Sequence, residues 1–311
     1  MVTNEELNKA LNSQNINGEA RLVDLDDTIK FNCKRCGKCC SGRTDIILNP
    51  YDVYNIAKGL EITPEEVIKQ YCNVHCGSNS CLPIVTLKED KRGLCPFLKF
   101  FANEGKFGCS VNNFKPGACI MHPIGIVRSV DQITHKQEKQ FIEVPSCDIH
   151  GIETEIKIRD FIKPYLDKEE EHDIGSMLTF EVTKYIDTRK FIKCFVEQDD
   201  EMLHKYFSEE KIELIKSLSE FLVQASYKTF MGSTLMSLYD FDMNKGFIEQ
   251  IADVKQKIKD NCIKMLATFS VIGFDLSSDD FAEENRILIE YEVNKLEEDF
   301  HDFLKDNKEG E

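Results

Sequence analysis

The sequence lacks an apolar run long enough to cross a membrane and lacks any excess of positive charge. Its longest apolar-leaning stretches, 229–239 and 265–274, have about half of the ~20 residues that a spanning helix needs. The first 30 residues are polar and acidic, without the apolar segment of a secretory signal. The formal net charge of −16 argues against binding to nucleic acid or to an acidic membrane. We therefore predict a cytoplasmic protein that binds neither nucleic acid nor membrane.

Several familiar catalytic fingerprints are also missing. The sequence contains no P-loop, no dinucleotide-binding glycine pattern and no Ser-His-Asp ordering. Whether the protein is an enzyme therefore stays open at this stage. The informative feature is instead a set of 13 cysteines.

Cysteine, proline and charge are unevenly distributed along the chain. No proline follows Pro164, and only Cys194 and Cys262 follow Cys147. Residues 1–150 contain 18 basic and 18 acidic residues, whereas residues 151–311 contain 21 and 37, so the second part carries the whole net charge. These shifts predict a cysteine-cluster metal-binding module over residues 1–160 and an acidic helical domain over residues 161–311.

Local signals predict the class of fold. Asn49-Pro50 and Thr63-Pro64-Glu65-Glu66 are typical helix starts, and short apolar pieces separated by Gly, Pro and Asn follow from residue 72 to 147. Apolar residues recur at spacings of three and four over 248–266 and 289–303, which indicates helices with a core-facing stripe. We predict an α+β protein, a small irregular cysteine-rich module followed by a mostly helical bundle.

The densest motif places four thiols within eight residues, at Cys33, Cys36, Cys39 and Cys40. A Cys-x-x-Cys turn brings two sulfurs to one metal because the backbone amides between them point at the thiolates. In a reducing cytosol, such short spacings favour metal binding over disulfides. Basic residues that would offset the thiolate charge lie between the cysteines: Lys34, Arg35 and Lys38.

Further cysteines follow in short motifs: Cys95-Pro96-Phe97-Leu98, Gly108-Cys109-Ser110, Lys115-Pro116-Gly117-Ala118-Cys119 with His122-Pro123, and Cys147. Together with the opening motif, they resemble the YkgJ-like cysteine-cluster family, described as a zinc- or iron-chelating CxxCxxCC domain. The resemblance covers residues 31–160 and extends distantly to flagellin lysine N-methylases. It implies eight metal-ligating cysteines: Cys33, Cys36, Cys39, Cys40, Cys95, Cys109, Cys119 and Cys147.

Four thiolates complete either a tetrahedral zinc site or a cubane iron–sulfur cluster. A Cys-x-x-Cys-x-x-Cys run with a remote Cys-Pro is similar to the ferredoxin arrangement, so we predict a 4Fe-4S cluster, with zinc as the alternative. The adjacent Cys39 and Cys40 cannot both easily face one metal, which leaves the number of sites open. Cys72, Cys76 and Cys81 are interpreted either as incidental thiols or as a lesser metal site.

These observations predict a metal-binding protein. One alternative, implied by the methylase resemblance, is an iron–sulfur enzyme that modifies the side chains of a protein substrate. Another is a zinc-stabilised interaction protein whose acidic helices bind a basic protein partner.

Overall fold

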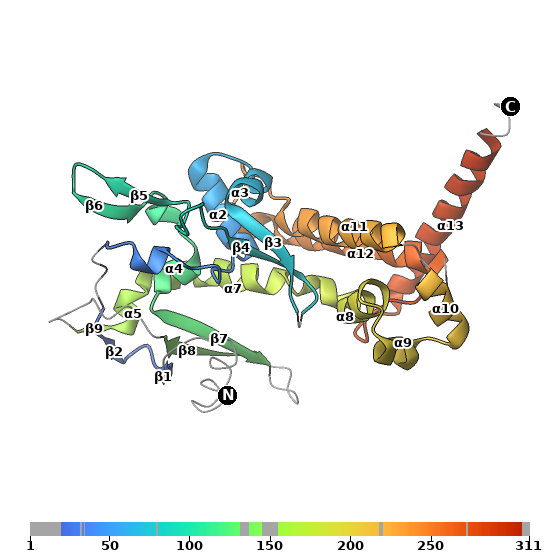
Figure 1. Cartoon of the computed structure of the whole chain (residues 1–311), viewed down its shortest axis with the longest axis horizontal. Helices are drawn as coiled ribbons and strands as arrows, with labels where there is room; N and C mark the ends of the chain where they lie inside the picture. Colours follow the sequence, from blue (N-terminus) through green and yellow to red (C-terminus); the bar gives the residue numbers. More distant parts are fainter. Residues whose placement is uncertain are drawn as a thin grey trace. The chain divides into compact units, whose positions relative to one another are not determined.

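The computed structural model of the chain describes residues 20–31, 33, 35–78, 80–130, 137–144, 155–217, 220–271 and 273–306. They form two compact units (Figure 1). Unit 1 lies within residues 1–73 and 86–173, and unit 2 within residues 74–85 and 174–311. The combination of helices with small antiparallel sheets confirms the predicted α+β class.

The division differs from the one predicted at residue 160. The first unit continues to Asp173 because Ile158, Ile162 and Tyr165 belong to its hydrophobic core. The segment 74–85 lies within the cysteine-rich part of the sequence, but in the fold it belongs to unit 2. The content of cysteine, proline and charge therefore changes near residue 160, whereas the packing of the hydrophobic core determines where unit 1 ends.

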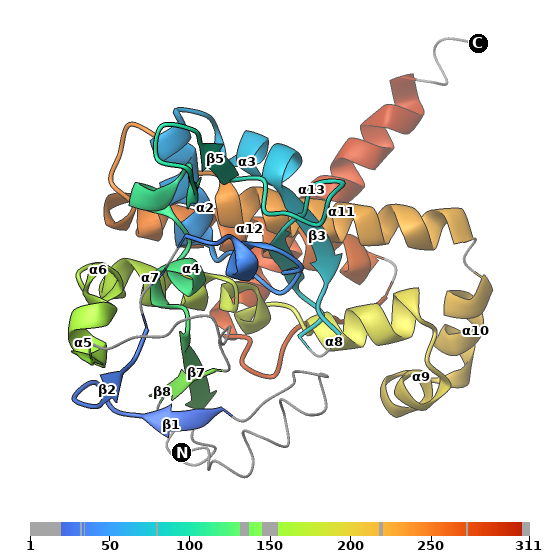
Figure 2. The ribbon, with the colours of Figure 1, turned by 60° about the vertical axis from the view of Figure 1, so that its left-hand side comes forward.

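Unit 1 combines short strands with short helices. Its three-stranded antiparallel sheet has the order β1-β8-β7, with Val23 opposite Phe141 and Ile126 opposite Phe141 (Figure 2). Two further strand pairs, β2-β9 and β5-β6, are also antiparallel. The strands are β1 (Arg21–Val23), β2 (Thr28–Ile29), β5 (Leu98–Phe101), β6 (Lys106–Cys109), β7 (Ile124–Val130), β8 (Gln137–Glu143) and β9 (Ile156–Lys157). The helices are η1 (Lys38–Cys40), α2 (Pro50–Leu60), α3 (Pro64–Tyr71), η2 (Asn112–Phe114), α4 (Gly117–Met121), α5 (Ile158–Phe161) and α6 (Lys163–Leu166).

Both predicted helix starts in this region are confirmed. The Asn49 side chain accepts a hydrogen bond from the Asp52 amide, and the Asp52 carboxylate accepts one from the Asn49 amide. Thr63 and Glu66 form the same reciprocal pair at the start of α3. Each pair satisfies two amides that the first helical turn would otherwise leave without a partner.

One apolar cluster of unit 1 gathers elements that are distant in the sequence. It joins β1, β2, α4, β7, α5 and α6. Its buried members are Val23, Ile29, Phe31, Met121, Ile124, Ile158, Ile162 and Tyr165. The loop of Cys33 to Cys40 begins directly after Phe31, so this core fixes the point from which the densest cysteine motif departs.

Unit 2 is built mainly of helices. They are α8 (Thr188–Phe191), a π-helix η4 (Ile192–Val196), α9 (Asp200–Tyr206), α10 (Glu209–Ser217), α11 (Glu220–Tyr239), α12 (Ile251–Val271) and α13 (Glu284–Asp306), with short 3₁₀ turns η3 (Glu181–Lys184) and η5 (Ile248–Gln250). The helix α7 (Glu169–Leu178) contains the boundary between the units. Strands β3 (Cys72–Cys76) and β4 (Pro83–Leu87) pair, and the Thr188 hydroxyl donates to the Ser80 carbonyl in the loop between them, at 3.0 Å.

An aromatic cluster forms the centre of unit 2. Phe191, Phe230 and Phe274 are fully buried, and the Phe191 and Phe230 rings lie 4.8 Å apart. Phe195 packs edge-on against Phe274 with centroids 5.0 Å apart. Such rings bury a large apolar area each, so this cluster is stabilised by apolar burial.

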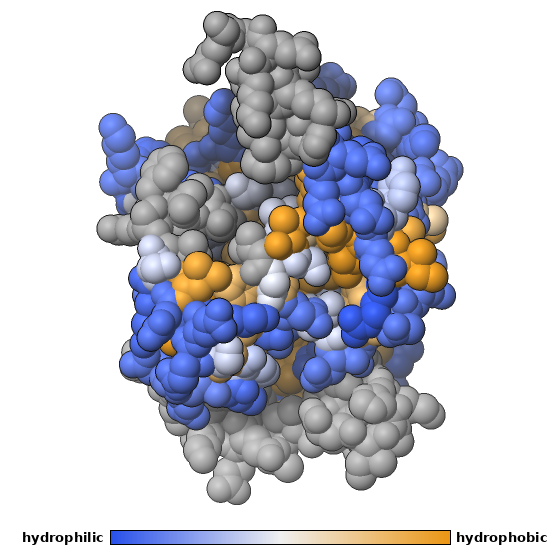
Figure 3. Space-filling view, turned by 90° about the vertical axis from the view of Figure 1, so that its right-hand side faces the viewer, coloured by the Kyte–Doolittle hydropathy of each residue, from blue (hydrophilic) through white to orange (hydrophobic). Residues whose placement is uncertain are grey.

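The two apolar stripes predicted near the C-terminus have different outcomes. On α12, Ile258, Cys262 and Leu266 are buried, as predicted. On α13 the predicted stripe is covered in part: Ile289 and Val293 are half-buried and Leu296 is 38% exposed, while the side chains of Phe300 and Phe303 lie outside the described part of the chain. On one face of the molecule, apolar patches lie among hydrophilic side chains (Figure 3). A helical period identifies an apolar face, but it does not show which of its positions a neighbouring helix covers.

No helix within the described residues has both the length and the apolar character required to cross a membrane.

Candidate metal centre

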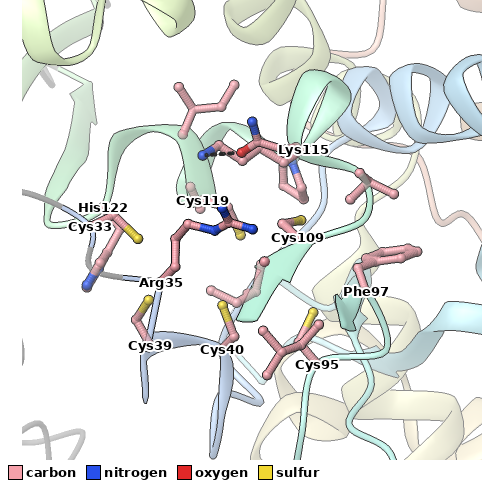
Figure 4. Close-up of a pocket in the computed structure, with 18 of the residues that line it drawn as sticks. Cys33, Arg35, Cys39, Cys40, Cys95, Phe97, Cys109, Lys115, Cys119 and His122 are labelled. Atoms are coloured by element: carbon pink, nitrogen blue, oxygen red, sulfur yellow. Dashed lines mark hydrogen bonds between the residues drawn. The ribbon is translucent and has the colours of Figure 1, made fainter. Parts of the chain in front are cut away.

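Unit 1 contains a cavity of about 820 Å³ whose wall is rich in cysteine (Figure 4). Seven of the eight cysteines that the resemblance singles out line it: Cys33, Cys36, Cys39, Cys40, Cys95, Cys109 and Cys119. The eighth, Cys147, lies outside the described residues. Residues separated by up to 86 positions in the sequence thus converge on one space, with Cys33 and Cys119 as the most distant pair.

Backbone hydrogen bonds fix the first cysteine loop against the segment of Cys95. Gly37 adopts a left-handed conformation with φ of 77°, and its carbonyl accepts from the Cys40 amide at 3.0 Å to close the turn η1. The Cys40 carbonyl in turn accepts from the Cys95 amide at 2.9 Å. A residue with a Cβ is strained at this φ, so glycine between the cysteines is a requirement of the turn. The backbones of Cys40 and Cys95 are therefore direct neighbours.

The β5-β6 hairpin places Cys109 beside the same segment. Leu98 pairs with Cys109 across the hairpin, and the Leu98 amide donates to the Cys95 carbonyl at 3.0 Å. The Ser110 amide donates to the Phe97 carbonyl at 2.8 Å and closes the pairing just beyond Cys109. Cys95 and Cys109 consequently line the cavity from two neighbouring segments, the turn before β5 and the end of β6.

Cys119 enters the cavity from the short helix α4. The Asp52 carboxylate on α2 accepts from the Gly117 amide at 2.9 Å and holds the start of α4. A Cβ at Gly117 would lie 2.9 Å from the His172 ring, closer than side-chain atoms normally approach. Glycine at this position allows α4, and with it Cys119, to come close to α7.

Burial dominates the electrostatics of the innermost thiols. It raises the pKa values of Cys95 and Cys109, and it raises the pKa of Cys119 to about 12, with a smaller effect from the neighbouring thiols of Cys95 and Cys109. The pKa of Cys40 is raised by its hydrogen bond with Cys39, by burial and by the same neighbours. These thiols are therefore protonated in the metal-free protein at neutral pH, and binding a metal must release their protons.

Cys39 has the opposite tendency. Its hydrogen bond with the Cys40 thiol lowers its pKa to about 6, and the positive charges of Arg43 and Lys115 act in the same direction. A thiolate is thus available at neutral pH at Cys39. From the sequence alone, we predicted that Lys34, Arg35 and Lys38 within the loop would offset the thiolate charge.

Arg35 serves instead to attach the cysteine loop to the β5-β6 hairpin. Its Nε donates to the Phe107 carbonyl at 2.8 Å, and its guanidinium pairs with Glu104. The same group lies 5.5 Å from the centroid of the Phe101 ring. These contacts join the turn between Cys33 and Cys36 to the strands that carry Cys109.

A buried carboxylate–imidazole pair beside the cavity was not predicted from the sequence. Asp52 and His172 are 4% and 3% exposed, and His172 Nδ1 lies 3.5 Å from Asp52 Oδ1. Burial raises the pKa of Asp52 to about 6 and lowers the pKa of His172 to about 4. The ring of Tyr165 stacks on His172 with centroids 4.5 Å apart. The Asn49-to-Asp52 capping box was a visible signal, but nothing in it pointed to a histidine on α7.

The remaining candidate residues are placed as follows. His122 lines the cavity, edge-on to the Phe31 ring at 5.8 Å. Cys72 and Cys81 are buried and do not line this cavity, and burial raises the pKa of Cys72 to about 12. None of the cysteines in the described part of the chain is in a disulfide.

Within the described residues, no three Cys, His, Asp or Glu side chains are arranged so that they could share a single metal ion. The convergence of thiols is therefore a matter of a common cavity rather than of one tight ligand set.

Comparisons with protein-family models, with curated proteins and with solved structures find no match for this chain. The cysteine-cluster resemblance accordingly rests on the residues of the motifs themselves.

Proposed function

We propose that unit 1 binds a thiolate-ligated metal group in this cavity, and that the group is an iron–sulfur cluster. The observation that carries the proposal is the convergence of seven cysteines on one cavity of about 820 Å³. Free cysteines are common as small buried hydrophobes, but those are dispersed through a core. Seven around one space have the donor chemistry of a soft metal site.

The volume of the cavity, about 820 Å³, favours a cluster over a single zinc ion. Zn–S bonds of about 2.3 Å in a tetrahedron hold the sulfurs about 3.8 Å apart. No three described side chains are placed to share one ion, although seven thiols face a common cavity. A group of several iron and sulfide atoms spans a wider space and requires less movement of the cysteines.

The charges around the cavity also suit a thiolate-ligated group. Arg43 and Lys115 line the wall and act on Cys39, and both would offset the negative charge of a cluster with thiolate ligands. A bound iron–sulfur cluster would supply one-electron transfer or a Lewis-acidic iron. The chain's own residues would hold it, shield it with Phe97 and Phe101, and balance its charge.

Metal and sulfide analysis of the full chain, purified without oxygen, tests the proposal. We expect stoichiometric iron with acid-labile sulfide and visible absorption. A Cys95→Ser variant should lose it, whereas Cys262→Ala, a buried cysteine of unit 2, should retain it. A colourless protein holding zinc and no sulfide would replace the cluster by the predicted alternative, and a protein without either metal would refute the site.

A second candidate function concerns unit 2, which we propose binds a basic protein partner. Residues 151–311 carry the whole net charge of −16, and α13 exposes Ile287 and Tyr291 between acidic residues. A lysine-rich peptide should bind the chain and be released as salt shortens the Debye length to about 8 Å or less. Salt-independent binding, or none, would contradict this proposal. Modification of a protein side chain at the cluster and a cytoplasmic location stay predictions of the sequence.

A further inference from the structure

The β5-β6 hairpin of unit 1 carries an exposed pair of aromatic rings, Phe100 and Phe107, here called the hairpin face. The two residues are opposite each other in the register of the strands, and their rings pack edge-on with centroids 5.3 Å apart. They are 57% and 39% exposed. Figure 1 shows the hairpin projecting from the rest of unit 1. The described part of unit 1 thus leaves an apolar sheet face open to solvent.

The cysteine loop fixes the position of this hairpin. A Cβ at Gly37 would lie 3.2 Å from Leu98 and 3.7 Å from the Phe107 ring, so the loop packs directly on β5 and β6. On the opposite face of β6, a Cβ at Gly108 would lie 2.7 Å from the Arg35 guanidinium. The loop therefore contacts the hairpin on both faces, which holds the hairpin face in place beside the cavity.

Positive charge surrounds the hairpin face. The segments 30–43 and 95–115, which contain the cysteine loop and the hairpin, have eight basic residues and one acidic residue. Lys38, Lys99 and Lys106 are exposed and form no ion pair with a described residue. In a protein with a net charge of −16, this is a local reversal of sign. A basic surface with apolar rings at its centre complements an acidic surface that also exposes apolar side chains.

The chain itself has such an acidic surface on α13 of unit 2. This helix contains eight acidic and three basic residues. Ile287 and Tyr291, here called the α13 face, lie one turn apart and are 70% and 64% exposed. Glu284, Lys295 and Glu298 lie on the same side of the helix, so the charge around the α13 face is net negative.

From this complementarity we propose that the chain associates with itself, with the hairpin face of one copy docked on the α13 face of another. The proposal rests on the proposed binding of a basic partner by unit 2, and it identifies that partner as unit 1 of a second copy. Because the two surfaces differ, the contact is heterologous. Burial of the apolar side chains provides the affinity, and the opposite charges steer the encounter.

Sedimentation velocity of the full chain, measured over a range of protein and salt concentrations, tests the proposal. Wild-type protein should associate at low salt, and the association should weaken as salt shortens the Debye length to about 8 Å or less. Phe100→Ser and Tyr291→Ser, one on each face, should each weaken it by about tenfold or more. Ile47→Ser and Met236→Ser are the matched controls, because these side chains are 56% and 61% exposed and belong to neither face. Both controls should associate like wild type, and a wild-type protein that is monomeric throughout would overturn the proposal.

Mixing the two interface variants tests whether the two faces bind each other. Phe100→Ser keeps an intact α13 face and Tyr291→Ser keeps an intact hairpin face, so the mixture retains one complete contact. It should form a complex with one copy of each variant, although each variant alone is monomeric. That result would also show that both variants are folded, since each supplies an intact face. A mixture that does not associate would contradict the pairing of the hairpin face with the α13 face.

A lysine-rich peptide separates failure of this inference from failure of the proposed function. Peptide binding by a chain that stays monomeric would overturn self-association and leave the basic-partner function in place, whereas no peptide binding would contradict that function itself. In a chain that does both, the peptide should compete with self-association, because it occupies the acidic surface around the α13 face. Self-association that saturating peptide leaves unchanged would overturn the proposed contact.

Discussion

The interiors of the two units differ in composition. Unit 2 fills its centre with aromatic rings, among them the fully buried Phe191, Phe230 and Phe274. Unit 1 has, beside its apolar clusters, a cavity of about 820 Å³ lined by thiols. An aromatic core is stabilised by burial alone, whereas a cavity of protonated thiols is not. The difference suggests that unit 1 completes its structure with a ligand and that unit 2 does not.

Removing the metal should have the largest effect, and the effect should be confined to unit 1. Treating the reduced protein with a chelator should expose the amides of residues 35–47 and 93–121, because the metal-coupled folding energy of a structural site is on the order of 10 kcal/mol. Helix α12 should keep its protection. Hydrogen exchange read by mass spectrometry measures both regions in one sample. Equal loss of protection in the two regions, or no loss in either, would contradict the distinction between the units.

A complementary change in unit 2 should leave the metal in place. Phe230→Ala removes a ring that is 0% exposed and lies 4.8 Å from Phe191, so it should lower the stability of unit 2 by about 3–5 kcal/mol. Faster hydrogen exchange in α11 and α12 would report the loss, and metal content per chain should stay at the wild-type value. Phe281→Ala, outside this buried cluster, is the control.

The parts of the fold that were predictable depend on local chemistry. The capping residues Asn49 and Thr63 act within three positions of themselves, so the sequence alone indicated both helix starts. The grouping of Cys33 with Cys119 was anticipated through motif order, which carries long-range information that periodicity does not. The stripe of α13 was predictable only in its period: Ile289 and Val293 are half-buried and Leu296 is exposed, because the spacing does not show which positions a neighbouring helix covers.

The buried pair Asp52 and His172 was beyond prediction for a related reason. Asp52 has the pattern of an ordinary acidic residue in a first helical turn. Its contact with His172 joins α2 to α7 through the tertiary fold, and no local spacing encodes it. The consequence, a neutral buried imidazole beside the cavity, is visible only once both helices are in place.

The imidazole gives unit 1 an acid sensitivity that can be isolated. Burial lowers the pKa of His172 from 6.5 to about 4, so between these pH values the unfolded chain binds a proton that the folded chain does not. His172 alone should therefore lower stability as pH falls through this window, by up to about 3 kcal/mol, and the raised pKa of Asp52 should offset part of that loss. In His172→Phe only the Asp52 effect is left, so the protection of α4 from hydrogen exchange, with metal bound, should be higher at pH 5 relative to pH 7 than it is in wild type.

The matched control for that measurement is Tyr165→Phe. It keeps the ring that stacks on His172 and removes only a hydroxyl that does not titrate between pH 5 and 7. Its pH dependence should equal that of wild type. Asp52, whose pKa burial raises to about 6, changes in the opposite sense and is present in all three proteins. An unchanged pH dependence in His172→Phe would show that the imidazole is not the source.

A smaller effect is expected where α4 approaches α7. In Gly117→Ala the new methyl group would lie 2.9 Å from the His172 ring and 3.2 Å from the Tyr165 ring, so one of the packed elements must move. Overpacking of this kind costs about 1–3 kcal/mol. We expect faster exchange in α4 and faster loss of metal to a chelator, because Cys119 lies two residues further on. Wild-type rates in both measurements would show that the contact is not tight.

The smallest effect has the opposite sign and belongs to unit 2. Gly232 lies inside α11, and no described atom within 4 Å would meet a Cβ placed there. Because glycine loses more backbone freedom on folding than alanine, Gly232→Ala should stabilise the helix by about 0.5–1 kcal/mol. Slower hydrogen exchange across α11, with unchanged metal content, would express that gain. The same substitution in the two units would then weaken the one packed around a cysteine-lined cavity and strengthen the one packed around its own rings. Destabilisation in both would mean that α11 is as closely packed at this position as α4 is at Gly117.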